Sequence, residues 1–127
     1  MTREAPPPLQ YERAARLPQP GMRWMGGRFE DVPVPLEFTL DYEVSYMDVS
    51  ARGPRVADLR YTGRSLLNDV LTQVQQVMSK AGWQSTSLTG TAIKTLRFVK
   101  GEEECVLIIH KGDDGGSVIM VRLHPRA

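Results

Sequence analysis

Three side chains in this 127-residue chain could act as a nucleophile or a general base: Cys105, His110 and His124. Cysteine catalysis needs a lowered thiol pKa and a base within reach. Cys105 lies among apolar residues in a strand-like pattern, where a free thiol behaves as a small apolar side chain. His110 ends the same pattern on the opposite face, because successive strand residues alternate between faces. The spacing therefore predicts core and surface roles for these residues, and no cysteine–histidine pair.

Two acidic segments have residue types that could hold a metal ion or act as acid and base. Residues 112–116 combine two aspartates with three glycines, but they lack the distal bidentate carboxylate of a calcium loop. They also precede a strand-like segment, whereas phosphate loops lead into a helix. Residues 102–104 are three glutamates at a strand start, where no cleft is predicted. We expect no catalytic residues, no metal site and no cofactor, and hence a protein that is not an enzyme.

The charge balance does not indicate a polyanionic partner. Sixteen Lys and Arg stand against fifteen Asp and Glu, which gives a net charge of +1. We therefore expect no nucleic-acid partner. No apolar run approaches the ~20 residues of a membrane-spanning helix, and the first 35 positions lack the roughly 7–15 apolar residues of a secretory signal. As the sequence stands, this predicts a cytoplasmic protein; an envelope-associated or periplasmic location is the alternative if a native signal was removed.

The first 35 residues differ in composition from the rest of the chain. They contain seven of the nine prolines, which remove backbone donors and favour extended conformations. They also carry large apolar side chains, which disordered linkers usually lack. Two interpretations remain open: an unstructured leader, or an extended arm that docks on another surface.

The arm contains residue types that dominate protein interfaces, namely aromatic residues, methionine and arginine. The candidate partner-binding residues are Tyr11, Met22, Arg23, Trp24, Met25, Arg28 and Phe29. Arginine interleaved with aromatic residues also suits single-stranded nucleic acid. Five arginines of the arm face four acidic residues, however, so protein contact is favoured.

Hydrophobic periodicity predicts the elements of the remaining chain. Alternation over 38–46 and 55–62 indicates two strands, and a stripe of apolar residues at helical spacing indicates an amphipathic helix over about 64–81. Gly82 is placed to end that helix in a left-handed conformation. Three further strands are expected over 93–99, 104–110 and 117–123, and residues 84–90 form either a weak edge strand or a loop.

This order, β-β-α-β-β-β, predicts an α+β fold. We expect a two-layer sandwich, in which an antiparallel sheet packs one face against the single helix. The predicted organisation is an extended Pro-rich arm over 1–35, one domain over 36–124 and a short tail over 125–127.

The last two predicted strands are apolar on both faces, as in Val106 and Ile108 opposite Leu107 and Ile109. Such strands are normally buried on both sides. One helix covers only one face of a sheet, so we expect the arm, a second copy of the chain or another protein to cover the other face. The alternative is that these are simply central strands.

Short motifs resemble those of a group of small, uncharacterised bacterial α+β domains. They are Asp31-Val32-Pro33-Val34-Pro35, which fits a D-x-P-x-P pattern, Tyr61-Thr62-Gly63 ahead of the helix, and Gly82-Trp83 after it. The resemblance covers about residues 31–110 and implies a bacterial, non-catalytic accessory domain. Some members of that group are lipoproteins; for the sequence as it stands, we expect neither a lipid-anchored cysteine nor a signal.

These observations favour a non-enzymatic protein–protein interaction module. We expect an accessory or assembly subunit of a larger bacterial complex, which binds other subunits or itself through the arm and the sheet face opposite the helix. The alternative is a small apolar-ligand carrier, with a pocket between helix and sheet lined by Tyr42, Tyr46, Tyr61 and Val74.

Overall fold

The computed structural model describes residues 22–49 and 54–126. These residues form nine strands, one α-helix and one short 3-10 helix. In chain order the elements are β1 (Gly26–Phe29), β2 (Val32–Val34), β3 (Thr39–Leu40), the 3-10 helix η2 (Tyr42–Val44), β4 (Tyr46–Asp48), β5 (Val56–Gly63), α1 (Leu67–Lys80), β6 (Gln84–Thr89), β7 (Ile93–Lys100), β8 (Glu103–Lys111) and β9 (Ser117–Pro125).

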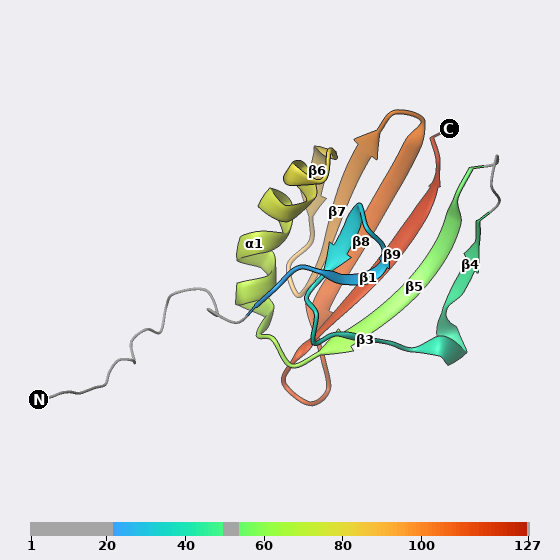
Figure 1. Cartoon of the computed structure of the whole chain (residues 1–127). Coiled ribbons are helices and arrows are strands. Elements are labelled where there is room, and N and C mark those ends of the chain that lie inside the picture. The colour runs from blue at the N-terminus through green and yellow to red at the C-terminus, as the bar shows by residue number, and fades with distance from the viewer. Residues whose placement is uncertain (1–21, 50–53, 127) are drawn as a thin grey trace, which may run out of the picture.

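Seven of the strands form one antiparallel sheet in the order β3-β5-β9-β8-β7-β6, with β4 also paired to β5. Strands β1 and β2 form a separate hairpin. The hairpin and α1 lie on the same side of the large sheet, as Figure 1 shows, and their apolar residues join one core. The predicted α+β fold, an antiparallel sheet with a helix on one face, is confirmed.

Helix α1 forms where the apolar residues recur at four-residue intervals. Val70, Val74 and Met78 are fully buried, which places one stripe of the helix against the sheet. Gly82 ends the helix with a φ of +98°, a left-handed conformation that glycine adopts without steric cost. Residues 84–90, for which the sequence left an edge strand and a loop as alternatives, contain β6, an edge strand.

The single strand expected over 38–46 is divided into β3, η2 and β4. The Asp41 carboxylate accepts a hydrogen bond of 3.2 Å from the backbone N–H of Glu43, and this turn interrupts the ladder. The Ser45 hydroxyl accepts a 3.0 Å hydrogen bond from the backbone N–H of Arg60. Side-chain hydrogen bonds therefore replace the strand pairing that alternation alone predicts.

The domain boundary predicted at residue 36 is misplaced. Phe29, Val32 and Val34 are buried in the same core as the helix and the large sheet. Residues 22–35 therefore belong to the packed domain rather than to a separate arm. Residues 1–21 lie outside the described part of the chain. At the other end β9 extends through Pro125, so the tail predicted from residue 125 begins within a strand.

The sheet face opposite the helix is less exposed than the sequence suggests. Alternation places Val106 and Val118 on this face, yet their side chains are only 5% and 2% exposed. On the neighbouring strands Val106 pairs with Arg97 and Arg122, and Val118 pairs with Thr62 and His110. In the described ranges the hairpin and α1 both lie on the other face. The central strands thus bury these valines largely through their own neighbours.

Because the hairpin contributes to the core, truncation tests its role. We expect a chain that begins at residue 36 to lose its cooperative unfolding transition in urea, since it lacks three core side chains. A chain that begins at residue 22 keeps every described contact and is the matched control. Equal stability of the two truncated chains, measured by circular dichroism, would show that the hairpin is dispensable.

Candidate functional site

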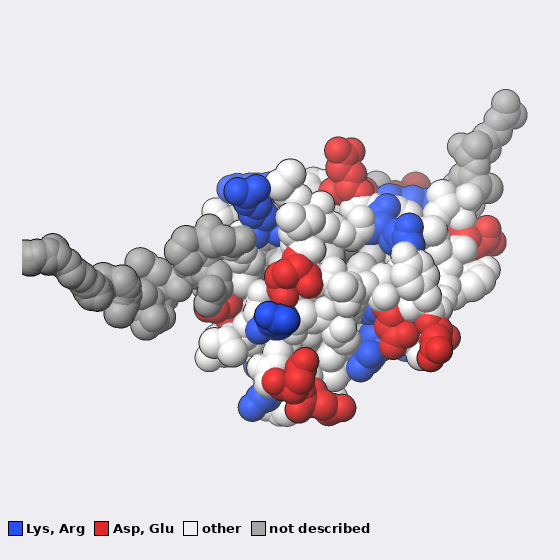
Figure 2. Space-filling model, turned by 60° about the horizontal axis from the view of Figure 1, so that its bottom comes forward, with Lys and Arg blue, Asp and Glu red and all other residues white. Residues whose placement is uncertain are grey.

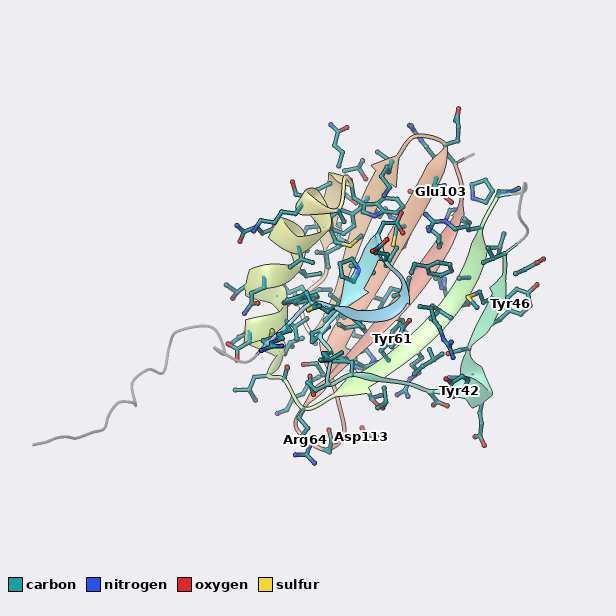
Figure 3. The ribbon with its side chains drawn as sticks, in the orientation of Figure 1. Tyr42, Tyr46, Tyr61, Arg64, Glu103 and Asp113 are labelled. Carbon is teal, nitrogen blue, oxygen red and sulfur yellow. The ribbon has the colours of Figure 1, made fainter. Side chains whose placement is uncertain are left out.

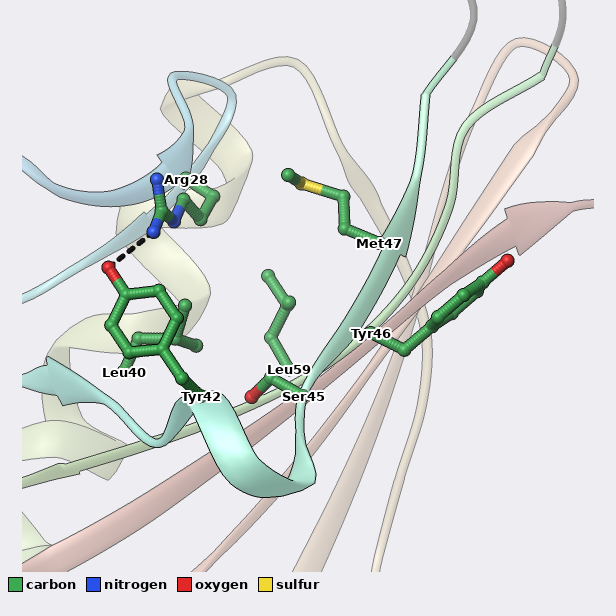
Figure 4. A pocket seen from close by; sticks show the side chains of 7 residues that line it. All are labelled: Arg28, Leu40, Tyr42, Ser45, Tyr46, Met47 and Leu59. Atoms are coloured by element: carbon green, nitrogen blue, oxygen red, sulfur yellow. Dashed lines mark hydrogen bonds between the residues drawn. The ribbon is translucent and has the colours of Figure 1, made fainter.

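A hollow lies on the helix side of the sheet, beyond the hairpin and over β5 and β4. Its volume is about 190 Å³, and its lining residues are Arg28, Leu40, Tyr42, Ser45, Tyr46, Met47 and Leu59. Figure 4 shows Met47, Leu59, Leu40 and Tyr42 around the open space, with Arg28 at its hairpin side. The Tyr46 ring points away from the other side chains in the same view.

The segment that borders the hollow exposes an unusual number of large apolar side chains. Tyr42 is 71% exposed and Tyr46 58% exposed. Three more exposed apolar residues lie within the same eight positions: Val44, Met47 and Val49. Figure 3 shows Tyr42 and Tyr46 at the β4 side of the sheet, remote from α1. We call residues 42–49 the apolar segment; a concentration of this kind is typical of an interaction surface.

The hairpin places Arg28 at the hollow. The Arg28 guanidinium donates a hydrogen bond to the Tyr42 hydroxyl and lies 5.2 Å from the centre of its ring. The backbone N–H of Arg28 donates a 3.0 Å hydrogen bond to the Tyr61 hydroxyl. Burial raises the pKa of Tyr61. The backbone of Arg28 is therefore held by Tyr61 and its guanidinium by Tyr42.

Arg28 has no carboxylate partner within the described residues. The ion pairs found among these residues are formed by other basic side chains. These pairs involve Arg55, Arg60, Arg97, Lys100, Arg122 and His124 as the basic members. Figure 2 shows acidic and basic side chains interspersed over one face of the molecule, with apolar and neutral surface between them. The Arg28 guanidinium thus lies beside an apolar hollow, bound to Tyr42 and without a carboxylate partner among the described residues.

A cluster of charges at the turn of the hairpin holds it against the sheet. The Arg55 guanidinium donates two hydrogen bonds of 2.9 Å to the Asp31 carboxylate and two more, of 2.9 and 2.6 Å, to Glu103. Lys100 Nζ lies 2.6 Å from Asp31 Oδ2 and also donates to the Ala81 carbonyl at 3.0 Å. Asp31 therefore connects the hairpin to β5, β7 and β8, through partners that are themselves about three-quarters buried.

Aromatic side chains complete this cluster. The Trp83 indole N–H donates a 2.6 Å hydrogen bond to the Asp31 backbone carbonyl, and Lys100 Nζ lies 4.8 Å from the Trp83 ring centre. Arg55 lies 5.1 Å from the ring centre of Phe29. These cation–π contacts surround the ion pairs with apolar groups, which strengthens the electrostatic interactions.

The structure distributes the predicted partner-binding residues over several environments. Phe29 is a core residue, and Trp24 is part-buried, with its indole N–H donating to Gln73 Oε1 at 2.9 Å. Met22 is part-buried, Arg23 is exposed and Met25 is 74% exposed. Only Arg28 lines the hollow, and Tyr11 lies outside the described residues.

The pocket expected between helix and sheet differs from the observed one. Tyr61 and Val74 are buried in the core, and neither lines the hollow. Tyr42 and Tyr46 instead lie at the edge of the sheet, where the chain leaves the regular strand at η2. Met47 was not singled out by the sequence. The signal that could have identified it is the concentration of apolar residues over 44–49, which are Val44, Tyr46, Met47 and Val49.

The residues first considered for catalysis are not brought together. Cys105 is fully buried, and burial raises its thiol pKa to about 12. His124 lies 3.4 Å from Glu104, and the His110 ring contacts the neighbouring Lys111 carbonyl at 2.8 Å. Residues 22–49 and 54–126 contain no group of three His, Cys, Asp or Glu side chains placed to hold a metal ion. Across the same residues, no helix is long and apolar enough to cross a membrane.

Comparison of the chain with family models, curated proteins and solved structures found no significant match in any of the three. The resemblance to small bacterial α+β domains therefore stays a prediction. Two of the residues that carry it, Asp31 and Trp83, are in direct contact in the fold.

The charge cluster predicts a pH dependence of stability. Hydrogen bonds from Arg55 and Lys100 lower the pKa of Asp31 from 3.8 to about 2, against the opposing effect of burial, and Arg55 also lowers the pKa of Glu103. A lowered carboxyl pKa contributes stability above the unfolded-state value, and this contribution is lost as the pH falls from about 4 towards 2. We expect Asp31→Asn to remove about 1–2 kcal/mol of unfolding free energy at pH 7, discounted for partial exposure.

The measurement is urea unfolding of the wild type and Asp31→Asn between pH 2 and 7. The difference between the two unfolding free energies should shrink as the pH falls. A difference that stays constant over this range would contradict the assignment of the ion pairs. Asp58→Asn, which removes a more exposed and longer ion pair, is the matched control.

Proposed function

We propose that this protein is a non-enzymatic protein–protein interaction module, an accessory or assembly subunit of a larger bacterial complex. It binds its partner through the apolar segment 42–49 and the adjoining hollow. The observation that supports this most directly is the exposure of five large apolar side chains within eight residues. The bacterial setting is what the resemblance implies.

Physical reasoning supports this surface as the binding site. Large apolar groups gain about 25 cal/mol for each Å² removed from water, and tyrosine and methionine are enriched in the centres of interfaces. The hollow provides a concave centre, and Tyr42 and Met47 provide raised margins. This combination of a pocket and exposed anchors is typical of sites where a few residues supply most of the binding energy.

The surfaces expected from the sequence have less support. Of the predicted arm, residues 22–35 are committed to the fold, although Met25 and Arg28 remain accessible. The sheet face opposite the helix already buries Val106 and Val118 and carries ion pairs such as Arg97 with Glu104 at 3.9 Å. Part of the apolar surface of that face is thus already removed from water.

A small apolar-ligand carrier is the second candidate, because the hollow is lined by Leu40, Met47 and Leu59. Its volume of about 190 Å³ is below the roughly 300–1,000 Å³ of pockets that enclose a drug-sized molecule. The hollow therefore suits one inserted side chain better than a whole carried ligand.

Site-specific photo-cross-linking in the producing cell tests the proposal. With the cross-linking residue at position 47, we expect a discrete adduct of higher mass, which Tyr42→Ser weakens by removing a contact. Position 88 is the matched control, because Leu88 is also half-exposed but lies on β6 at the opposite edge of the sheet. Mass spectrometry then distinguishes another protein from a second copy of this chain. Equal labelling at both positions, or no adduct at position 47, would contradict the proposal.

A further inference from the structure

The strongest unassigned feature is the combination of an apolar hollow and a guanidinium without a carboxylate partner among the described residues. We propose that the hollow binds one large apolar side chain of a partner protein, and that Arg28 binds a carboxylate adjacent to that side chain. The recognised element is thus an aromatic or aliphatic residue next to Asp or Glu. This inference rests on the proposed function and specifies its partner.

The size of the hollow limits the occupant. A single water has a share of about 30 Å³ of the liquid, so the hollow, at about 190 Å³, holds far more than one water. It is too small for a whole ligand of drug size. Its walls are mainly carbon atoms of Leu40, Met47 and Leu59, which favour an apolar group over a polar one. One inserted apolar side chain satisfies both limits.

Charge limits what lies beside that group. The Arg28 guanidinium lies 5.2 Å from the Tyr42 ring centre and donates to its hydroxyl, which leaves further N–H donors for another acceptor. Arginine binds carboxylates through paired hydrogen bonds, and fixing its position in advance lowers the entropy lost on binding. Because the backbone N–H of Arg28 is held by Tyr61, the fold fixes the backbone position from which this side chain extends to Tyr42.

The neighbouring charges sharpen the specificity. Glu43 and Asp48 both lie within the apolar segment, and neither forms an ion pair among the described residues. Where the partner faces Glu43 or Asp48 instead of Arg28, these acidic side chains repel a partner carboxylate and favour a neutral or basic residue. A partner sequence with one acid next to its apolar anchor is therefore preferred over a uniformly acidic segment.

The test is an NMR titration of the ¹⁵N-labelled full chain with capped tetrapeptides. The probes are acetyl-Gly-Phe-Glu-Gly-amide and two analogues, in which Gln or Lys replaces Glu. We expect the Glu peptide to shift the amide signals of Arg28 and of residues 40–47. Replacement of Glu by Gln should weaken its binding about three- to tenfold, because the charge-assisted contact is lost.

Variants assign the effect to Arg28. Arg28→Gln should bind the Glu and Gln peptides equally, and Arg28→Glu should prefer the Lys peptide. Arg23→Gln, which changes an exposed arginine on the same segment, is the matched control and should keep the wild-type preference. Amide spectra of each variant report whether the fold is retained, so a loss of preference without a loss of fold is interpretable.

Three results would overturn the inference. They are equal binding of all three peptides to the wild type, shifts confined to a surface away from the hollow, and tighter binding of free phenylpropionate than of the Glu peptide. The last result would assign the hollow to small apolar acids. If the peptides fail to bind but position 47 still yields a cross-linked protein, the proposed function stands and only this specificity is wrong.

Discussion

The architecture of the described chain depends most on the contacts of Asp31, a residue at the turn between β1 and β2. Its carboxylate binds Arg55 and Lys100, and its backbone carbonyl accepts a hydrogen bond from the Trp83 indole N–H. These contacts connect a short hairpin, which could not be stable alone, to three strands and to the end of the helix. Through the hairpin they complete the core and hold Arg28 at the hollow.

Part-buried ion pairs of this kind contribute little if either partner has alternatives in water. Here the geometry limits the competition from water. Arg55 bridges two carboxylates, the Phe29 ring covers Arg55, and the Trp83 ring covers Lys100. The cluster therefore specifies where the hairpin sits as much as it stabilises the fold. The apolar segment 42–49 has no comparable set of ion pairs among the described residues; only Asp41, at its start, binds Arg60 at 3.4 Å.

Local sequence patterns predicted the elements whose residues follow one period throughout. The apolar stripe of α1 and the alternation in β7 belong to this class, whereas β8 and β9 were predicted from continuous apolar runs bounded by turns. The hairpin could not be predicted in the same way, because Pro33 argues against a central strand; β2 tolerates it since it pairs with β1 alone. The sequence did single out Asp31 and Trp83 through their motifs, although nothing in it showed that they meet.

The hollow was the least predictable feature. Alternation assigned Tyr42 and Tyr46 to the same strand face as Phe38, which is a core residue. The Asp41 turn breaks that register, so both tyrosines leave the core, and Tyr42 comes to line the hollow beside Arg28 of the hairpin. The hydrogen bond that the Asp41 side chain accepts therefore determines where the hollow forms. A turn of this kind also depends on tertiary contacts, here the hydrogen bond between Ser45 and Arg60.

Amide and indole hydrogen exchange of the full chain tests the central claim, that the hairpin is a fixed part of the domain. The Arg28 amide and the Trp83 indole N–H should be protected to a similar degree as amides of β8 and β9, because both are donated within the packed domain. Exchange of these two protons at the rate of an unstructured peptide, with β8 and β9 still protected, would contradict it. The hairpin would then be a detachable arm, and Arg28 would have no fixed place at the hollow.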